Sequence, residues 1–116
     1  MRYAVAARQE ESDNPLYEMA LIQAFEFTFA LGWKNVKDFL KNEGLNNLSL
    51  PREVIKQGFH HHVIEDGQGW IEMMEDRNLM SHPYDEARVQ IAVSRITNHY
   101  LAALEQVYTY LHQRWV

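Results

Sequence analysis

The sequence contains no cysteine, only three prolines and five glycines, and no long apolar run. Without cysteine the chain has neither disulfides nor a thiolate nucleophile, which fits a reducing compartment. No stretch approaches the roughly 20 apolar residues that span a bilayer as a helix. The first five residues also lack the apolar segment of a signal peptide. We therefore expect a cytoplasmic protein without a membrane segment.

The composition fits one globular domain. The chain has 116 residues, of which 47% are hydrophobic and 23% charged. A chain of this length can bury one core but is short for two domains. We therefore expect a single domain over residues 1–116.

The net charge of −5 is concentrated in one part of the sequence. Between Glu65 and Gln90 there are seven acidic residues and only two basic ones, Arg77 and Arg88. This window therefore accounts for the whole net negative charge of the chain. A protein that holds long nucleic acids by counterion release presents a basic surface. The distribution disfavours tight, sequence-independent binding of RNA or DNA and favours a basic protein partner.

Hydrophobic periodicity predicts helices throughout and no alternating strand. Pro15 follows a capping residue, which is typical of a helix start, and Gly44 is typical of a helix end. Asp66 and Asp85 can cap later helices, and Pro83 interrupts the chain between them. The predicted helices cover residues 2–11, 16–43, 51–63, 66 to 81 or 82, and 85 onward through Leu111.

These segments predict an all-α, antiparallel, up-and-down bundle of the four-helix type with a short extra helix. Gly32 lies inside the first long helix, where glycine costs about 1 kcal/mol relative to alanine. We expect a neighbouring helix to approach closely there. Apolar residues on a second side of this helix (Ala20, Ala24, Phe27 and Leu31) predict burial on more than one side.

Four polar residues around Pro83 form the best candidate site. Arg77 offers a planar fork of donors that suits phosphate oxygens, and Asn78 adds an amide. His82 titrates near neutral pH and can move a proton, and Tyr84 lies just beyond the break. Arg77 and His82 converge only if His82 lies in a frayed last turn, which Pro83 favours.

Each of these residues also has a purely structural interpretation. Arg77 could pair with Glu72 or Glu75 on its own helix, or with an acid on another helix. His82 could interact with a helix C-terminus, and Tyr84 could pack across the connection.

Three consecutive histidines, at positions 60, 61 and 62, raise the question of a metal site. Neighbouring helical residues point in different directions, so the three cannot ligate one ion together. We predict neither a metal site nor a cofactor. The aromatic residues Phe25, Phe27, Phe29 and Trp33 are typical of a core or a dimer interface.

Several ordered blocks resemble one family of small helical proteins. The pattern Arg77-x4-His82-x-Tyr84 between two helices is similar to the signature of HEPN domains. The fuller run over residues 76–86 resembles the nucleotidyltransferase substrate-binding proteins more closely. So do residues 23–34, 49–55 and 69–70. The chain departs from that family in having Pro83 inside the motif and a short segment before Asn14.

The resemblance implies a HEPN-like bundle, usually a homodimer in which two motif copies share a cleft. It also implies a separate minimal nucleotidyltransferase as partner. In toxin–antitoxin members the HEPN chain is a metal-independent RNase, and the partner silences it, in some cases by transferring AMP to the motif tyrosine. For this chain it implies that Arg77 stabilises phosphate charge, Asn78 orients the site, His82 handles a ribose proton and Tyr84 can accept AMP.

Three functions therefore compete. The first is a non-catalytic partner subunit of a nucleotidyltransferase, which binds or accepts an ATP-derived nucleotide between Arg77 and Tyr84. The second is a HEPN-type endoribonuclease toxin with Arg77 and His82 as catalytic residues and RNA as substrate. The third is a structural bundle without a site. The acidic window favours the first over the second.

Overall fold

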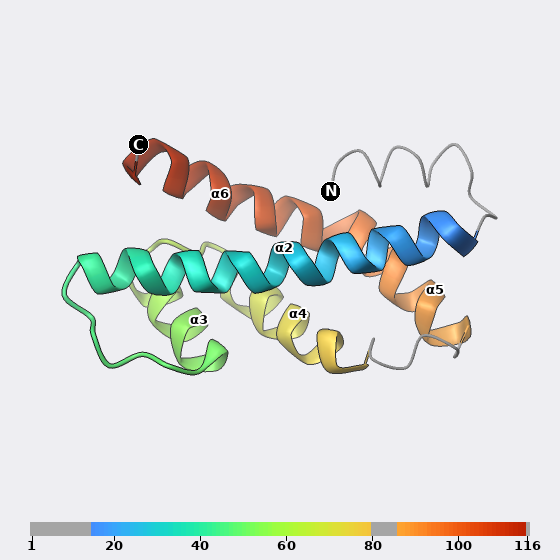
Figure 1. The fold of residues 1–116 in the computed structure, drawn as a ribbon, viewed down its shortest axis with the longest axis horizontal. Coiled ribbons are helices and arrows are strands. Elements are labelled where there is room, and N and C mark those ends of the chain that lie inside the picture. Colours follow the sequence, from blue (N-terminus) through green and yellow to red (C-terminus); the bar gives the residue numbers. More distant parts are fainter. Residues whose placement is uncertain (1–14, 80–85, 116) are drawn as a thin grey trace.

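A computed structural model describes residues 15–79 and 86–115, and the described part is all-α. It consists of α2 (Pro15–Asn42), α3 (Pro51–His60), α4 (Gly67–Leu79), α5 (Glu86–Arg95), a π-helical turn η1 (Ile96–Tyr100) and α6 (Leu101–Trp115). α2 runs the length of the molecule, with α6 on one side and α3 and α4 on the other (Figure 1). The predicted all-α bundle is confirmed, and in the described ranges no helix is long and apolar enough to cross a membrane.

The predicted start and end of the first long helix agree with α2. Pro15 is its first residue, where the missing N–H costs nothing. At the other end Gly44 has a φ of 102°, a left-handed conformation that glycine adopts without strain. The Leu45 N–H donates to the Leu40 carbonyl at 2.9 Å and the Gly44 N–H to the Lys41 carbonyl at 3.0 Å. This pair of bonds is a Schellman motif, so the glycine signal was correctly interpreted.

α3 ends three residues earlier than the sequence predicts. His62 takes the left-handed conformation with a φ of 64°, and the Val63 N–H bonds the Gly58 carbonyl at 2.9 Å. The same C-terminal motif forms here without a glycine, so the sequence carries no marker for it. The turn lets Val63 and Ile64 enter the core at 0% and 1% exposure.

α4 is held against α2 by a close approach at Gly32. A Cβ atom at Gly32 would lie 2.9 Å from Cη2 of Trp70, whose side chain is fully buried. The prediction of a tight helix contact at this glycine is confirmed. Asp66 caps α4 through its Oδ1, which accepts from the Gly69 N–H at 2.9 Å. The predicted end of α4 near residue 81 or 82 lies outside the described residues.

The last helix is interrupted by one turn that the sequence did not predict. Residues 86–115 form a continuous helical segment, in which the turn Ile96–Tyr100 is π-helical. Such turns insert one extra residue into an α-helix and are frequent at functional sites. Here the turn places Tyr100 in the core at 1% exposure. The predicted cap at Asp85 and the helix over residues 2–11 lie outside the described residues.

The core runs along one face of α2, as predicted, with Phe25, Phe29 and Val36 at 0% exposure. The opposite face of α2 differs from the prediction. Phe27 is 68% and Leu31 43% exposed, and Ala20 is also exposed. Within the described part of the chain the prediction that α2 is buried on a second side is therefore wrong. Periodicity shows which residues share a face but not whether another element of the same chain covers it.

Candidate functional site

Arg77 lies in the last turn of α4, two residues before its end at Leu79. Its side chain is exposed, and its guanidinium carbon lies 5.9 Å from the centroid of the Phe29 ring on α2. The guanidinium is therefore within cation–π range of a ring on α2. Asn78 follows within α4, but its side chain is not described, and His82 and Tyr84 lie outside the described residues. The predicted convergence of these four side chains therefore stays a prediction.

Within the described ranges Arg77 forms no ion pair with Glu72 or Glu75. The structural alternative of an intrahelical ion pair is thus wrong for these two partners. An Arg side chain that rests on an aromatic ring keeps its donors available to solvent or to an anion.

The preceding residue, Asp76, is buried at 6% exposure. Nη1 of Arg95 donates to its two oxygens at 2.6 and 2.7 Å, and the Tyr100 hydroxyl donates to Oδ2. Its partners come from α5 and from the π-helical turn, so the network ties the end of α4 to the interrupted helix. A buried carboxylate is tolerated because charged and neutral donors satisfy it.

The Asp76 network also sets the ionisation of its partners. Burial, together with the hydrogen bond to Asp76, raises the pKa of Tyr100 well above its usual range. The hydrogen bonds and the negative charge of Asp76 likewise raise the pKa of the Arg95 guanidinium. Tyr100 therefore remains a neutral donor, and Arg95 a cation, at any physiological pH.

Around this network lies an open cavity of about 300 Å³, lined by Glu72, Glu75, Asp76, Arg95, His99 and Tyr100. The sequence analysis did not identify Asp76, Arg95 or Tyr100 as site residues. The sequence did contain an indication that Asp76 is buried. Asp76 follows the buried Met73 by three residues, so it lies on the core-facing side of α4, where an apolar residue is expected.

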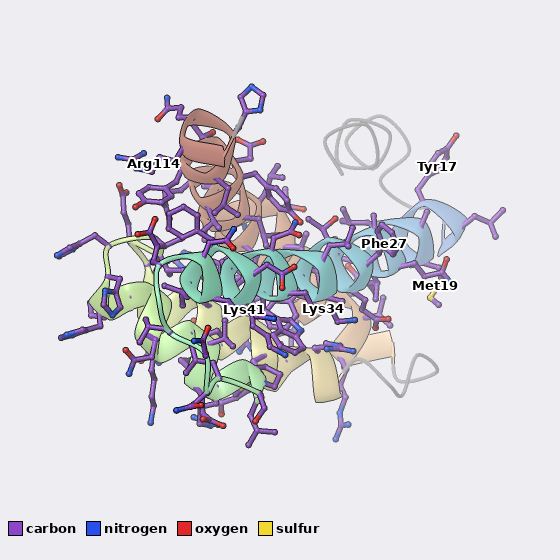
Figure 2. All side chains as sticks on the ribbon, turned by 60° about the vertical axis from the view of Figure 1, so that its left-hand side comes forward. Tyr17, Met19, Phe27, Lys34, Lys41 and Arg114 are labelled. Carbon is purple, nitrogen blue, oxygen red and sulfur yellow. The ribbon has the colours of Figure 1, made fainter. Side chains whose placement is uncertain are left out.

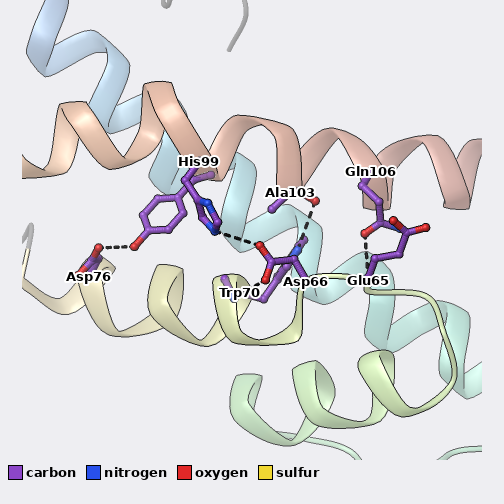
Figure 3. A network of polar contacts seen from close by, with 9 residues as sticks. Glu65, Asp66, Trp70, Asp76, His99, Ala103 and Gln106 are labelled. Carbon is purple, nitrogen blue, oxygen red and sulfur yellow. Dashed lines mark hydrogen bonds and ion pairs between the residues drawn. The ribbon is translucent and has the colours of Figure 1, made fainter.

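The other end of α4 is fixed by a second set of polar contacts (Figure 3). The Asp66 carboxylate lies 3.0 Å from Nε2 of His99, and the Trp70 indole N–H donates to the Ala103 carbonyl at 3.4 Å. Gln106 exchanges bonds with the loop before α4, accepting from the Glu65 N–H and donating to the Val63 carbonyl, both at 3.0 Å. Because α4 is held at both ends, the position of Arg77 is set by the fold.

The three histidines play a local role. His60 is the last residue of α3, and His61 and His62 form the turn after it; the His60 and His61 rings meet edge to face with their centroids 5.2 Å apart. Among the described side chains no group of three His, Asp or Glu residues could hold a metal ion.

Comparison with known proteins identifies the family. The model of the family described as nucleotidyltransferase substrate binding protein like matches residues 1–113. The chain belongs to this family. A curated relative, the probable ribonuclease HepT of Haemophilus influenzae, is 25% identical over 79 residues. That match covers 65% of this chain and 54% of the relative, so the chain spans about half the length of the protein it resembles.

The family assignment agrees with the all-α bundle and with the sequence resemblance. The relative is named a probable ribonuclease, whereas the family description names nucleotidyltransferase substrate binding. These names agree with either of the first two functions considered from the sequence and do not distinguish between them.

Proposed function

We propose that this chain is the cytoplasmic partner subunit of a separate minimal nucleotidyltransferase and that it binds or accepts a nucleotide at the Arg77–Tyr84 segment. The observation that carries the proposal is the exposed Arg77 fork, which pairs with no acid of the described ranges. It stands at the end of an α4 helix fixed at both ends, in a chain of this family. An exposed guanidinium beside an aromatic ring keeps donors available for a phosphate group.

In this function each residue of the segment has one task. Arg77 binds the nucleotide phosphates, Asn78 contacts the base or ribose, and His82 exchanges a proton near neutral pH. Tyr84 is the acceptor when the partner transfers AMP: its phenolic oxygen attacks the α-phosphorus of ATP, the bond to pyrophosphate breaks, and the phenol proton leaves to solvent. The subunit itself contributes binding and an acceptor, and the chemistry belongs to the nucleotidyltransferase. We further propose that the subunit acts as a homodimer.

Co-purification tests the partnership. The tagged chain is expressed with the nucleotidyltransferase expected to be encoded beside it, and the expected result is a stable complex. The complex is then incubated with ATP and Mg²⁺, and the intact mass of the chain is measured. An added AMP group on the wild type but not on Tyr84→Phe is expected. An unmodified wild type would remove the acceptor role, and the absence of any complex would contradict the whole proposal.

A second function, that of a HEPN-type endoribonuclease toxin, is favoured by the relative that is named a probable ribonuclease. Arg77 would stabilise the phosphate and His82 would assist attack by the ribose 2′-hydroxyl, with RNA as substrate and the nucleotidyltransferase as antitoxin. Expression of the chain alone distinguishes the two functions. Growth arrest by the wild type, relieved by His82→Ala, supports the RNase, whereas equal growth supports the binding subunit.

A further inference from the structure

Arg77 is an exposed cation, but its surroundings differ from those of the exposed lysines on α2. Lys34 and Lys41, labelled in Figure 2, make no hydrogen bond or ion pair with the described residues. Arg77 instead has the Phe29 ring beside its guanidinium. A side chain that is held in place before a ligand arrives loses less freedom on binding. The contacts that hold this ring and the end of α4 therefore bear on how Arg77 can act.

A closed series of contacts links Arg77 to the buried carboxylate of Asp76. The Tyr100 hydroxyl donates to Asp76 (Figure 3), and the Tyr100 ring stacks on Phe25 with the centroids 5.5 Å apart. Phe25 in turn stacks on Phe29 at 6.3 Å, and Phe29 is the ring beside Arg77. Asp76 and Arg77 are consecutive residues of α4, so the series returns to its start. Two routes, one through the backbone and one through the rings, therefore connect Asp76 with the guanidinium.

Four of the five side chains in this contact series are buried. Phe25 and Phe29 are 0% exposed, Tyr100 is 1% and Asp76 is 6% exposed. Close-packed interiors leave little free space, so a displacement of one buried side chain is transmitted to its neighbours. Arg77 is the exposed member of the series. A change at Asp76 or Tyr100 should therefore alter the position of a group that solvent and ligands can reach.

The π-helical turn lets two donors reach the same carboxylate. Arg95 precedes this turn and Tyr100 ends it. In a regular α-helix, residues five positions apart point about 140° away from each other. A π-helical turn bonds residue i to residue i+5, so residues five apart lie on nearly the same side. Arg95 and Tyr100 accordingly both donate to Asp76, and three hydrogen bonds fix the orientation of its carboxylate.

We infer that Asp76 and Tyr100 are positioning residues for Arg77, which they hold where its guanidinium can bind the phosphates of the nucleotide. Asp76 fixes the backbone of the last turn of α4, and Tyr100 supports, through Phe25, the Phe29 ring beside the guanidinium. Asp76 and Tyr100 are both buried, so each acts through Arg77 and not on the nucleotide itself. The inference rests on the proposed function, in which Arg77 binds phosphate, and adds to it the residues that place the guanidinium.

Tyr100→Phe is the most selective variant for testing this inference. It keeps the ring that stacks on Phe25 and removes only the hydrogen bond to Asp76. Tyr108→Phe is the matched control, because the Tyr108 hydroxyl donates to the Thr28 carbonyl at 2.9 Å, outside the contact series. Each variant removes one phenol hydrogen bond from the same bundle, so both are expected to fold with a similar, modest loss of stability. A difference between them in the behaviour of the site then has another cause.

The side-chain Nε–H resonance of Arg77, measured by NMR on the isotope-labelled chain alone, reports the position of the guanidinium without any activity. The resonance is assigned by its loss in Arg77→Ala, and its chemical shift depends on where the side chain lies relative to the Phe29 ring. Tyr100→Phe and Asp76→Asn are expected to move it toward the value of a solvated arginine, whereas Tyr108→Phe leaves it in place. A resonance that Tyr100→Phe does not move, or that Tyr108→Phe moves as far, would overturn the inference.

The apparent KM for ATP in AMP transfer separates positioning from stability. In the complex with the nucleotidyltransferase, Tyr100→Phe is expected to raise this KM about three- to tenfold. The kcat should change little, because Arg77 binds the phosphates in the ground state as well. A chain that is only less stable lowers kcat in proportion to its folded fraction and keeps its KM. In an Arg77→Ala background Tyr100→Phe should have no further effect on KM, because the residue through which it acts is absent. A full additional effect in that background would contradict the inference.

The two measurements distinguish failure of the inference from failure of the proposed function. If the wild-type complex transfers no AMP, the acceptor role fails, and the NMR measurement still decides whether Asp76 and Tyr100 place Arg77. If AMP is transferred but Tyr100→Phe and Tyr108→Phe have equal KM values for ATP, the positioning role fails and the proposed function stands.

Discussion

At the scale of single residues, the most consequential side chain of the described structure is Asp76, which stands next to Arg77 in the sequence. It accepts hydrogen bonds from Arg95 and from Tyr100 while almost fully buried. Removing it leaves a buried phenol and a guanidinium without their acceptor. A group that has lost its partner in this way costs more than the bond itself contributed.

We predict that Asp76→Ala lowers the free energy of unfolding by about 2–4 kcal/mol. The Arg95 side chain is 50% exposed. Arg95→Ala is expected to cost less, about 1–2 kcal/mol, because water entering the open cavity beside Asp76 can replace part of the lost interaction. Urea denaturation followed by circular dichroism measures both values. Glu75→Ala, an exposed neighbour on α4, is the control and should change the value by less than about 0.5 kcal/mol. Equal effects of Asp76→Ala and Glu75→Ala would contradict the network.

Tyr100 makes the stability of the fold dependent on alkaline pH. Its pKa is raised in the folded state. Its contribution is therefore complete below the unfolded pKa of about 10 and is lost as pH rises above that value. We predict that Tyr100→Phe is less stable than the wild type at pH 8 by about 1–2 kcal/mol. The difference should narrow as pH increases above about 10, because only the wild type must ionise this phenol on unfolding. Urea titrations between about pH 8 and 11 measure it, and a constant difference would refute the linkage.

At the scale of helices and turns, the sequence predicted helix ends that depend on nearby residues, but not contacts between residues far apart in the sequence. Gly44 and Asp66 act on backbone groups within a few positions, so the sequence predicted the end of α2 and the start of α4. The partners of Asp76 are 19 and 24 residues away, and no local pattern indicates such a pairing. The π-helical turn ends at Tyr100, one of these distant partners, and no local pattern predicted the turn either. Of the Arg77–Tyr84 site, the described structure supports only the exposure of Arg77.

The end of α3 offers a direct test of backbone conformation. His62 has a φ of 64°. This region costs a residue with a side chain about 1 kcal/mol and costs glycine little. We predict that His62→Gly raises the free energy of unfolding by about 0.5–1 kcal/mol, measured in urea. His61→Gly is the matched control, because the φ of His61 is −95°. Glycine relieves nothing there and only adds freedom to the unfolded chain. Stabilisation by His61→Gly equal to that by His62→Gly would show that conformation is not the cause.

At the scale of the whole molecule, the described structure separates groups that hold the bundle from groups available for function. The polar contacts of Asp66, Trp70 and Asp76 fix both ends of α4 against the last helix, and the packing at Gly32 fixes its middle against α2. Arg77 is different, because its described contact is with the Phe29 ring alone. Stability and function should therefore respond to different substitutions on the same helix.

We predict that Arg77→Ala changes the free energy of unfolding by less than about 1 kcal/mol, the value of an exposed cation–π contact. The same variant is expected to lose at least about tenfold in AMP transfer to Tyr84, or in RNA cleavage if the chain is an RNase, which corresponds to about 1.4 kcal/mol of transition-state stabilisation. Arg77→Lys keeps the charge but loses the planar fork, so it should restore stability fully and activity only in part. Arg52→Ala, a substitution of a cation on α3, is expected to change neither quantity. An Arg77→Ala chain that unfolds several kcal/mol more easily, with activity reduced only in proportion to the folded fraction, would show that Arg77 serves the bundle and that the site lies elsewhere.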